Sequence, residues 1–366
     1  MSRDRDERFM RQALMLARKG YGRTSPNPMV GALLVKRGKV IGEGWHKRAG
    51  APHAEIEAIR AAANSRGATL YVTLEPCSTV GRTPSCVEAV KSVGIRRVVV
   101  AATDPNPAHA GRAFRRLRGA GIEVSKGVLA AEATELNAAF GHWIVNATPL
   151  VTVKAAMTLD GRIATAGGES KWITGPAARR HGQLLRKGSD AILVGINTVL
   201  ADDPALKAKG KLKSRPLRRI ILDSHARTPL AAKVLNDELA HVTTVVVTRD
   251  APERRVEAIA KKVNLLVSPI RTGRVDLRWL LKRLGREEVT NLLVEGGGEV
   301  NASFLQGDLA HRVAFFYAPK ILGGSEARRA VGGDGARSLD EVLELGNVEW
   351  SRVGADLLLT ARIVGA

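Results

Sequence analysis

The hydrophobic pattern along the first 146 residues alternates between helical and extended periods, which is typical of an α/β domain. Apolar residues recur at helical spacing over residues 7–19, and Gly20 ends that stretch. Two β-rich runs, residues 30–35 and 39–44, flank Arg37-Gly38 and predict a hairpin. Further helices are expected over residues 53–64, 86–93, 108–119 and 129–146, and further strands over 69–74, 97–102 and 122–124. This pattern predicts a sheet covered by helices.

The second half repeats the alternation after a break at Ala147-Thr148-Pro149. A proline after a long predicted helix marks a boundary, and a length of 366 residues favours two domains. We therefore place one domain over residues 1–147 and the other over 148–366. Strands are expected over residues 150–156, 191–195, 219–223, 242–248, 264–267, 291–295, 312–317 and 356–363, helices over 176–187, 251–261, 276–284 and 299–307, and a polar loop over 197–204.

The charge is strongly basic, with 57 Lys and Arg against 36 Asp and Glu. The excess is spread over both halves, and aromatic residues make up only 4% of the chain, so a stacking platform for nucleic acid is not expected. A basic surface of this kind attracts phosphorylated small molecules. The charged N-terminus lacks the apolar core of a signal peptide, and no apolar run approaches the ~20 residues of a membrane span. With two cysteines and no disulfide framework, a cytoplasmic location is expected.

The strongest chemical signal is His53-Ala54-Glu55 followed by Pro76-Cys77 and Cys86. One imidazole and two thiolates can hold a single Zn²⁺ and leave its fourth position open for water, which indicates a catalytic site. Glu55 is too near His53 in sequence to be the missing ligand by default, and it is well placed to carry a proton. The arrangement follows the general zinc deaminase signature H-x-E…P-C-x-x-C, except that eight residues instead of two separate the cysteines.

Two other interpretations of these residues stay open. The chain could deaminate a nucleic-acid base such as one in tRNA, with the second half as an appended binding domain. It could also be a non-enzymatic protein, with the zinc structural or the cysteines simply apolar core residues. A structural zinc would require a fourth protein ligand, and none is apparent near the triad.

The second half contains an apolar strand that runs into Gly296-Gly297-Gly298 and then a helix. Consecutive glycines allow backbone N–H groups to approach a phosphate at a helix N-terminus, although a plain tight turn explains them equally well. Glu295, at the end of the strand, could pair with a hydroxylated or cationic group of a substrate, or it could be a solvated strand terminus. The polar segments 170–174 and 197–204 are candidate ligand loops.

These residues resemble one family over nearly the whole chain. In the first half the resemblance is carried by residues 24–31, 44–46, 53–55 and 75–77 and by the loop to Cys86, whose eight-residue spacer contains Gly81-Arg82-Thr83-Pro84. In the second half it is carried by residues 154–165, 170–174, 197–206 and 294–298. Together they resemble the bifunctional deaminase–reductases of riboflavin biosynthesis.

The resemblance implies the fold class and the two reactions. It implies an N-terminal cytidine-deaminase-like three-layer domain and a C-terminal dihydrofolate-reductase-like α/β domain. The first would deaminate 2,5-diamino-6-(5-phosphoribosylamino)pyrimidin-4-one with Zn²⁺, and the second would reduce the ribosyl group to ribityl with NADPH. A phosphorylated pyrimidine substrate, no nucleic acid, no membrane and a homo-oligomer, dimer or tetramer, are expected.

The resemblance also assigns roles to individual residues. Glu55 would serve as both general acid and base, and Asn27, His46 and Arg82 would line the deaminase pocket. Lys154 and Asp202 are candidates for the proton donor in the reduction. The residues implied to contact NADPH are Ala156, Trp172, Thr198, Asp202, Ser224, Gly297 and Gly298. The residues implied to contact the reductase substrate are Lys154, Ser170, Arg186, Leu206 and Glu295.

Overall fold

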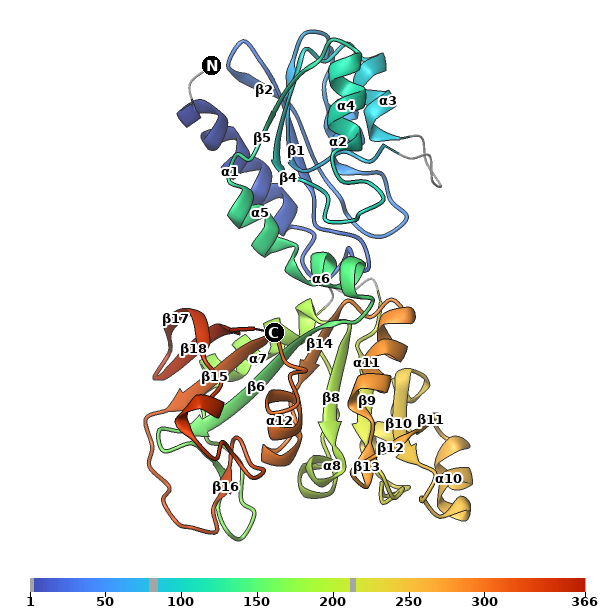
Figure 1. The fold of residues 1–366 in the computed structure, drawn as a ribbon, viewed down its shortest axis with the longest axis vertical. Helices are drawn as coiled ribbons and strands as arrows, with labels where there is room; N and C mark the ends of the chain where they lie inside the picture. The colour runs from blue at the N-terminus through green and yellow to red at the C-terminus, as the bar shows by residue number, and fades with distance from the viewer. Residues whose placement is uncertain (1–2, 79–84, 211–214, 366) are drawn as a thin grey trace. The chain divides into compact units, whose positions relative to one another are not determined.

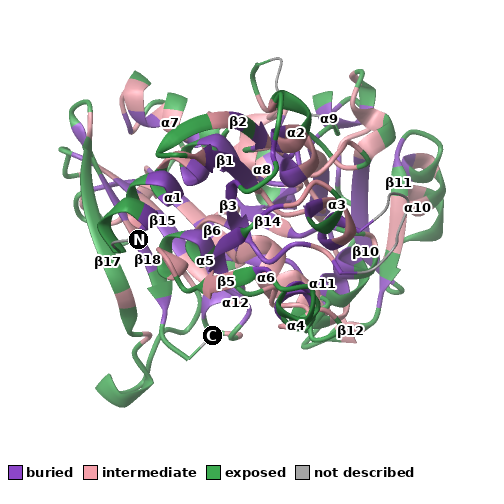
Figure 2. Ribbon diagram, turned by 90° about the horizontal axis from the view of Figure 1, so that it is seen from above, coloured by how far each residue is buried: buried purple, intermediate pink, exposed green. Residues whose placement is uncertain are grey.

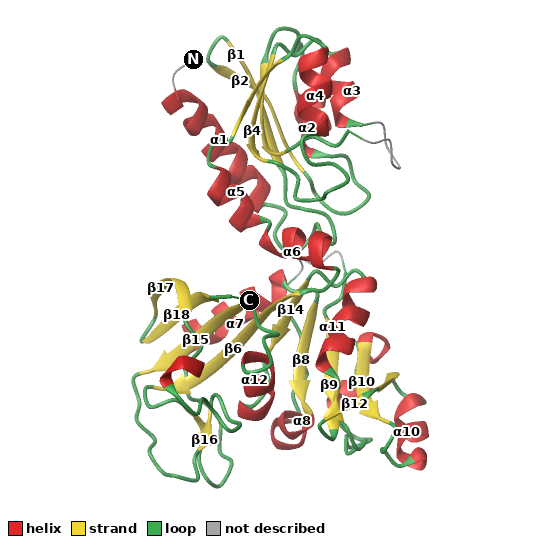
Figure 3. Ribbon diagram, in the orientation of Figure 1, coloured by secondary structure: helices red, strands yellow, loops and turns green. Residues whose placement is uncertain are grey.

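The computed structural model describes residues 3–78, 85–210 and 215–365 and divides into two compact units, Met1–Ala147 and Thr148–Ala366. Each unit is a β-sheet with helices packed on its faces (Figure 1 and Figure 3). This agrees with the predicted α/β fold class. No helix within the described ranges has the length and apolar character that crossing a bilayer requires.

The N-terminal unit is built on a five-stranded sheet of order β2-β1-β3-β4-β5. Its strands are β1 (Gly31–Lys36), β2 (Lys39–Trp45), β3 (Thr69–Leu74), β4 (Arg97–Ala102) and β5 (Glu123–Lys126). The first two form the predicted hairpin, and the last three run parallel to one another. Every residue of β3 and β4 is buried, so β4 is apolar from Val98 to Ala102 and the only interruptions in the otherwise hydrophobic β3 are two buried threonines.

Helices cover both faces of this sheet, as Figure 1 shows. They are α1 (Arg3–Arg18), α2 (Ala54–Ala61), α3 (Cys86–Ser92), α4 (Arg112–Gly119), α5 (Ala130–Leu136) and α6 (Ala138–Asn146). Residues of α1 and α5 pack in one apolar core, and residues of α2, α3 and α4 pack in the other. The second core matters for the site, because α2 and α3 carry metal-ligand candidates at their N-termini.

The single helix predicted over residues 129–146 is wrong. The helix breaks at Asn137, which ends α5 and begins α6 with a non-helical φ of −109°. The Asn137 amide exchanges two hydrogen bonds with the backbone of Met29, at 2.7 Å and 2.9 Å. Likewise, the helix predicted from residue 108 begins only at Arg112, because residues 107–111 form turns.

The C-terminal unit is built on a nine-stranded sheet of order β11-β10-β9-β8-β14-β6-β15-β18-β17. Its strands are β6 (Leu150–Thr158), β8 (Ala191–Gly195), β9 (Arg218–Leu222), β10 (Thr243–Thr248), β11 (Asn264–Ser268), β14 (Asn291–Val294), β15 (Arg312–Ala318), β17 (Leu345–Val353) and β18 (Asp356–Ile363). The strands from β11 to β15 are parallel, and β18 and β17 add antiparallel to that edge. Small two-stranded pairs are formed by β7 (Arg162–Ala164) with β16 (Arg328–Arg329) and by β12 (Ile270–Arg271) with β13 (Arg274–Val275).

The helices of this unit are α7 (Pro176–Gly188), α8 (Ile196–Asp202), α9 (Lys233–Asn236), α10 (Glu253–Ala260), α11 (Leu277–Arg286) and α12 (Gly298–Leu305), with short 3₁₀ turns at Ala240–Val242 and Leu339–Glu341. The polar loop predicted over residues 197–204 is wrong over most of its length, because α8 occupies Ile196–Asp202. Ile196 and Val199 are the buried residues of α8, and two apolar anchors are too few to show helical periodicity in sequence.

The strand β17, which forms one edge of the large sheet, was not predicted from the sequence. Figure 2 shows the contrast between this exposed strand and the buried central strands such as β6 and β14. Most of its residues are exposed, including Val348 and Trp350. A strand with little burial has no clear two-residue alternation, so the pattern gave no signal.

Candidate active sites

Three metal-ligand candidates converge in the N-terminal unit from three different elements. His53 is the N-cap of α2, Cys86 is the first residue of α3, and Cys77 lies in the loop that follows β3. His53 Nδ1 lies 3.2 Å from Cys86 Sγ and 3.6 Å from Cys77 Sγ. All three donor atoms lie within 4.8 Å of one another.

These separations fit a single zinc ion. Tetrahedral coordination with Zn–N near 2.0–2.1 Å and Zn–S near 2.3 Å places nitrogen and sulfur roughly 3.5 Å apart. Among the residues that the structure describes, no further His, Cys, Asp or Glu joins the cluster. The donor set therefore leaves a coordination position for water, as a catalytic site requires.

The protonation of the two thiols is coupled. A hydrogen bond with Cys86 lowers the pKa of Cys77 to about 4, and the same contact raises the pKa of Cys86. The backbone N–H of Cys86, at the N-terminus of α3, also donates to Cys77 Sγ at 3.2 Å. A bound divalent cation would hold both sulfurs as thiolates.

Glu55 lies beside this cluster without belonging to it. Its side chain is in the first turn of α2 and only 3% exposed. Burial raises the pKa of Glu55, the nearby His53 opposes that shift, and Cys77 adds to it. A carboxyl group that holds its proton more tightly than usual is suited to giving and taking protons next to an activated water.

His46 and Asn27 form a linked pair close to the metal ligands. The Pro52 carbonyl accepts a hydrogen bond from His46 Nδ1 at 3.1 Å, so Nε2 accepts from Asn27 Nδ2 at 3.1 Å. Burial lowers the pKa of His46, and its ring packs edge-on against that of His53. This hydrogen bond fixes the orientation of the Asn27 amide, with Nδ2 toward the His46 imidazole and Oδ1 away from it. The third predicted pocket residue, Arg82, lies outside the described residues.

Asp104 is a neighbour of the zinc site that the sequence analysis did not name. It lies in the loop after β4, and burial raises its pKa, with further contributions from Glu75 and Cys77. The available signal was the turn Asp104-Pro105-Asn106-Pro107, whose proline-rich composition predicts a rigid loop. Nothing in the sequence placed that loop beside Cys77.

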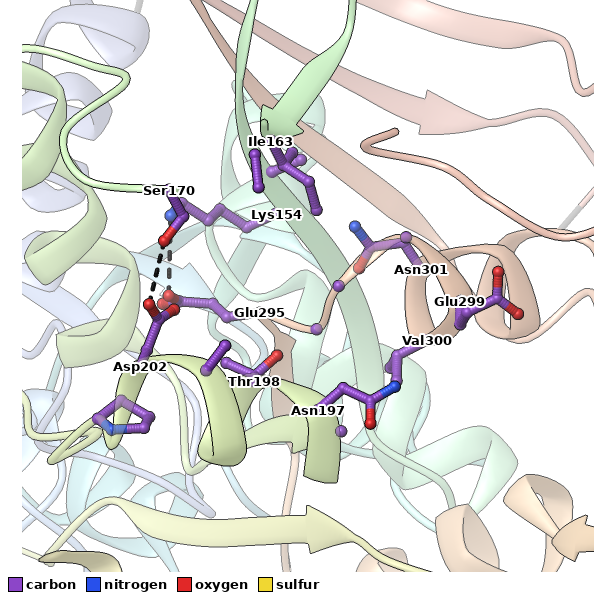
Figure 4. A pocket seen from close by; sticks show the side chains of 18 of the residues that line it. Lys154, Ile163, Ser170, Asn197, Thr198, Asp202, Glu295, Glu299, Val300 and Asn301 are labelled. Atoms are coloured by element: carbon purple, nitrogen blue, oxygen red, sulfur yellow. Dashed lines mark hydrogen bonds and ion pairs between the residues drawn. The ribbon is translucent and has the colours of Figure 1, made fainter. Parts of the chain in front are cut away.

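The C-terminal unit has a cleft of about 1580 Å³ where several parallel strands end. Ligands of open α/β sheets bind outside these carboxyl ends. The predicted residues that line it are Lys154, Ala156, Ser170, Trp172, Arg186, Thr198, Asp202, Ser224, Glu295, Gly297 and Gly298. Figure 4 shows Ser170, Asp202, Lys154 and Glu295 together on one side, with Asn197, Val300 and Asn301 on the other.

A charged cluster of Glu295, Arg186 and Lys154 lies in this cleft. Arg186 donates to both carboxylate oxygens of Glu295, at 2.8 Å and 2.9 Å, and Lys154 Nζ lies 3.7 Å from Glu295 Oε2. Burial alone would raise the pKa of Glu295, but the charge of Lys154 and the bonds from Arg186 outweigh it and lower the pKa to about 2. Glu295 therefore stays ionised at neutral pH and holds two cations in place.

The other predicted side chains on the Lys154 side are held by Asp202 at the end of α8. Ser170 Oγ donates to Asp202 Oδ1 at 3.0 Å, and Lys171 Nζ lies 3.6 Å from the same oxygen. Trp172 is 65% exposed, and the Arg179 guanidinium stacks on its ring at 4.5 Å. A large aromatic side chain left this accessible at a cleft offers a flat apolar surface to a ligand.

The three consecutive glycines at the N-terminus of α12 differ in what surrounds them. A Cβ on Gly296 would lie 2.4 Å from Val300 Cβ, and one on Gly298 would lie 2.4 Å from the carbonyl oxygen of Arg329. A Cβ on Gly297 would meet nothing within 4 Å. All three glycines line the cleft. Packing within the protein already requires glycine at positions 296 and 298, and only at Gly297 would a side chain meet no neighbouring atom.

Leu206 is the one predicted contact that does not line the cleft. Its side chain is 3% exposed and packs in the apolar core on the α9 side of the sheet, with Leu217 and Val234 among its companions. Its φ of +48° lies in the left-handed region. The predicted contact of Leu206 with a substrate therefore has no support in the lining of the cleft.

A basic rim at the end of the cleft near β9 was not predicted from the sequence. His225, Arg227 and Arg274 line it together with Ser224. Each lies in a turn or short strand that has no distinctive motif, so no signal singled it out. Asn301 was also missed, although it is 1% exposed and donates to the Ala330 carbonyl at 2.8 Å.

Two family models match the two units. Residues 3–102 match the cytidine and deoxycytidylate deaminase zinc-binding region, and residues 149–359 match the RibD C-terminal domain. The first match contains all three metal-ligand candidates and Glu55. The second contains every predicted residue of the cleft.

Full-length relatives and solved structures agree with these matches. The chain is 44% identical to the riboflavin biosynthesis protein RibD of Aquifex aeolicus, covering 98% of this chain and 99% of that protein. It is 40% identical to RibD of Escherichia coli K12, covering 99% and 100%. Acinetobacter baumannii RibD superposes with a TM-score of 0.88 at 37% identity, covering 99% of this chain and 100% of that one. A deaminase/reductase from Thermotoga maritima superposes with a TM-score of 0.85 at 35% identity, covering 99% of each chain.

Proposed function

The chain belongs to the RibD family of riboflavin-biosynthesis proteins, and we propose an activity for each of its two units. Residues 1–147 deaminate a pyrimidine nucleotide, and residues 148–366 reduce the deaminated product. The protein is a bifunctional enzyme, a zinc-dependent hydrolase and an NADPH-dependent oxidoreductase. It converts 2,5-diamino-6-(5-phosphoribosylamino)pyrimidin-4-one to the corresponding uracil and then to 5-amino-6-(5-phosphoribitylamino)uracil. The full-length relatives and the reductase match favour this activity over that of an RNA base deaminase.

The observation that carries the first activity is the grouping of His53, Cys77 and Cys86 beside buried Glu55. These three side chains would hold the zinc ion. Zn²⁺ bound there supplies Lewis-acid activation of a water molecule at neutral pH. Two thiolates balance the charge of the cation, so the site gains no large net charge.

Glu55 moves the protons in the deamination. It takes a proton from the attacking water and delivers it to the ring nitrogen next to the carbon that bears the amine. It then passes the hydroxyl proton of the tetrahedral adduct to the amine, which leaves as ammonia. One carboxyl group therefore serves as base and as acid.

The pyrimidine is held by groups around this centre. Asn27 presents its amide to the ring, and His46 fixes that amide through the bond between Nδ2 and Nε2. His46 is itself anchored by the Pro52 carbonyl, so the chain of hydrogen bonds orients Asn27 before the substrate arrives. Arg82 is proposed to bind the phosphate of the substrate in a bidentate contact.

The second activity depends on the charged cluster in the cleft. NADPH bound there supplies the hydride that reduces C1′ of the opened ribosyl group. Lys154 donates the proton that the imine nitrogen requires as the C–H bond forms, with Asp202 as the second candidate. Glu295 holds Lys154 and Arg186 toward the substrate, and Ser170 adds a polar contact.

The NADPH contacts are proposed on the remaining lining residues. Trp172 offers its exposed ring, Gly297 its open backbone, and Ser224 lies at the end of the cleft with the basic rim. Ala156, Thr198, Asp202 and Gly298 complete the set.

Assembly and location belong to the proposal as well. We expect a homo-oligomer, because β17 leaves a nine-residue strand with exposed Val348 and Trp350 at the edge of the sheet. Sedimentation of the purified protein tests this expectation. A pair of metal-binding thiols favours the reducing cytoplasm.

A direct assay tests the two activities. Purified protein with zinc is given the diaminopyrimidine nucleotide, and ammonia release and loss of NADPH absorbance are followed together. We expect ammonia before NADPH oxidation, and NADPH oxidation without delay when the deaminated substrate is supplied. Ammonia release from tRNA but not from the nucleotide would refute the assignment.

A further inference from the structure

Glu75 makes an unusual set of contacts just before the metal-binding loop. It follows β3 directly, lies two residues before Cys77 and is 5% exposed. Its Oε2 accepts from the backbone N–H groups of Asp104 at 3.2 Å and Gly111 at 2.9 Å, and its Oε1 accepts from that of Ala113 at 3.0 Å. Both carboxylate oxygens are thus occupied by main-chain donors of one segment.

These contacts replace the missing cap of α4. The N-cap residue of α4 is Gly111, which has φ +73° and no side chain to accept a hydrogen bond. The first N–H groups of a helix have no partner within the helix, and a negative charge at that end is favourable. Glu75, at the end of β3, accepts hydrogen bonds from two of these groups, the N–H groups of Gly111 and Ala113. It therefore fastens the end of β3 to the N-terminus of α4.

Cys77 is held from its other side by the same helix and by α3. Arg116 of α4 donates to the carbonyl oxygen of Ser78, directly after Cys77. The backbone N–H of Cys86 donates to Cys77 Sγ, and that of Val87 donates to the Cys77 carbonyl at 3.3 Å. The sulfur therefore lies in a short segment that is fixed to the N-termini of two helices.

We infer that Glu75 is the positioning residue of the zinc centre: it holds Cys77 at the ligand position by fastening the loop to α4. This rests on the zinc site of the proposed function. Glu75 is not a ligand, since it lies outside the donor cluster and its oxygens bond to the backbone. Without the Glu75 carboxylate, the segment that leads from β3 to Cys77 loses its hydrogen bonds to the N-terminus of α4.

Two variants and one control test the inference. Glu75→Gln keeps the size but turns an amide NH₂ toward backbone donors, and Glu75→Asp keeps the charge but shortens the reach. Glu43→Gln makes the same chemical change at an exposed residue of β2. Zinc affinity is measured by competition with a chromophoric chelator, and thermal melting followed by circular dichroism reports whether the N-terminal unit of each variant is folded.

We expect Glu75→Gln to weaken zinc binding about 10–100-fold, the range for groups that orient metal ligands. Glu75→Asp should weaken zinc binding less, and Glu43→Gln should bind zinc with wild-type affinity. The reductase rate should be unchanged in all three variants. In Co²⁺-substituted protein, Glu75→Gln should shift the thiolate-to-cobalt absorption. A purely structural role would lower its amplitude without shifting it, and would overturn the inference.

The outcomes separate this inference from the proposed function. Wild-type zinc affinity and an unshifted cobalt spectrum in both Glu75 variants would refute the role of Glu75 and leave the zinc centre intact. Failure of the wild-type protein to bind zinc or to release ammonia would instead refute the proposed deaminase site.

Discussion

The two sites differ in how the chain assembles them. The zinc site takes its donors from residues 53–86, and each donor is fixed by a helix N-terminus or by a short loop fastened to one. The reductase cleft is lined by residues between Lys154 and Gly333. They come from strands, helices and loops of the unit that contains the nine-stranded sheet. The first is a compact set of rare residue types, and the second is a large surface of common ones.

This difference follows from what each reaction asks of the protein. A metal ion needs a few donor atoms at fixed distances, so those residues cannot be exchanged for others. Posing a nicotinamide against a sugar carbon needs an extended surface, to which many side chains and backbone groups can contribute. The two sites should therefore respond independently to changes in either one.

Removal of the metal should distinguish the two activities most clearly. Dialysis against a strong chelator is expected to abolish ammonia release, because the water loses its activating cation, while NADPH oxidation with the deaminated substrate is unchanged. Adding back Zn²⁺ should restore deamination. Equal loss of both activities would show that the C-terminal unit depends on the zinc site.

Glu55→Gln should be the most damaging single substitution in the N-terminal unit. The amide cannot transfer protons, so the deaminase kcat should fall by about 10²–10⁴-fold. Metal analysis should find zinc at the wild-type level, since Glu55 lies outside the donor cluster. If the variant loses its zinc, Glu55 is a ligand and its proposed role as proton carrier is wrong.

Lys154→Met should produce the converse result. Loss of the cation beside Glu295 is expected to lower the reductase kcat by about 10²–10³-fold, the usual cost of deleting a preorganised charge. Deamination by the same sample should be unaffected. Lys282→Met, at an exposed position of α11, is the matched control and should retain both activities. A similar loss in the control would point to general charge effects.

A smaller effect is expected from the pH dependence of stability. The folded pKa of Glu295, about 2, lies below its ordinary value of 4.5. The stabilisation from its ionised form is complete above pH 4.5 and is lost as the pH falls toward 2, by at most about 3 kcal/mol. Thermal melting of Glu295→Gln should therefore depend less steeply on pH in this window. If the melting temperatures of the wild type and Glu295→Gln changed in parallel with pH, the ion pairs of Glu295 would not stabilise the fold as proposed.

Sequence reasoning worked best where a short segment carries its own chemistry or periodicity. The hairpin at Arg37-Gly38 and the continuous apolar strands were predicted because turn chemistry and burial leave a local pattern. The helix predicted over residues 129–146 failed because its break depends on Asn137 reaching Met29, which is 108 positions away. Such a contact leaves no periodic signal.

The sequence by itself indicated the family, the order of the two activities and the three metal-ligand candidates. His53, Glu55, Cys77 and Cys86 lie within 34 residues and belong to types whose chemistry few other residues share. Local spacing was therefore enough to indicate a zinc deaminase.

Tertiary structure alone decided how these residues are held and which glycines are open. The carboxylate of Glu75 reaches α4, Gly296 and Gly298 are required by packing, and Leu206 turns its side chain into the core. Each of these facts depends on elements that meet only after folding. Because packing partners are chosen by the whole arrangement of strands and helices, no local pattern in the chain could specify them.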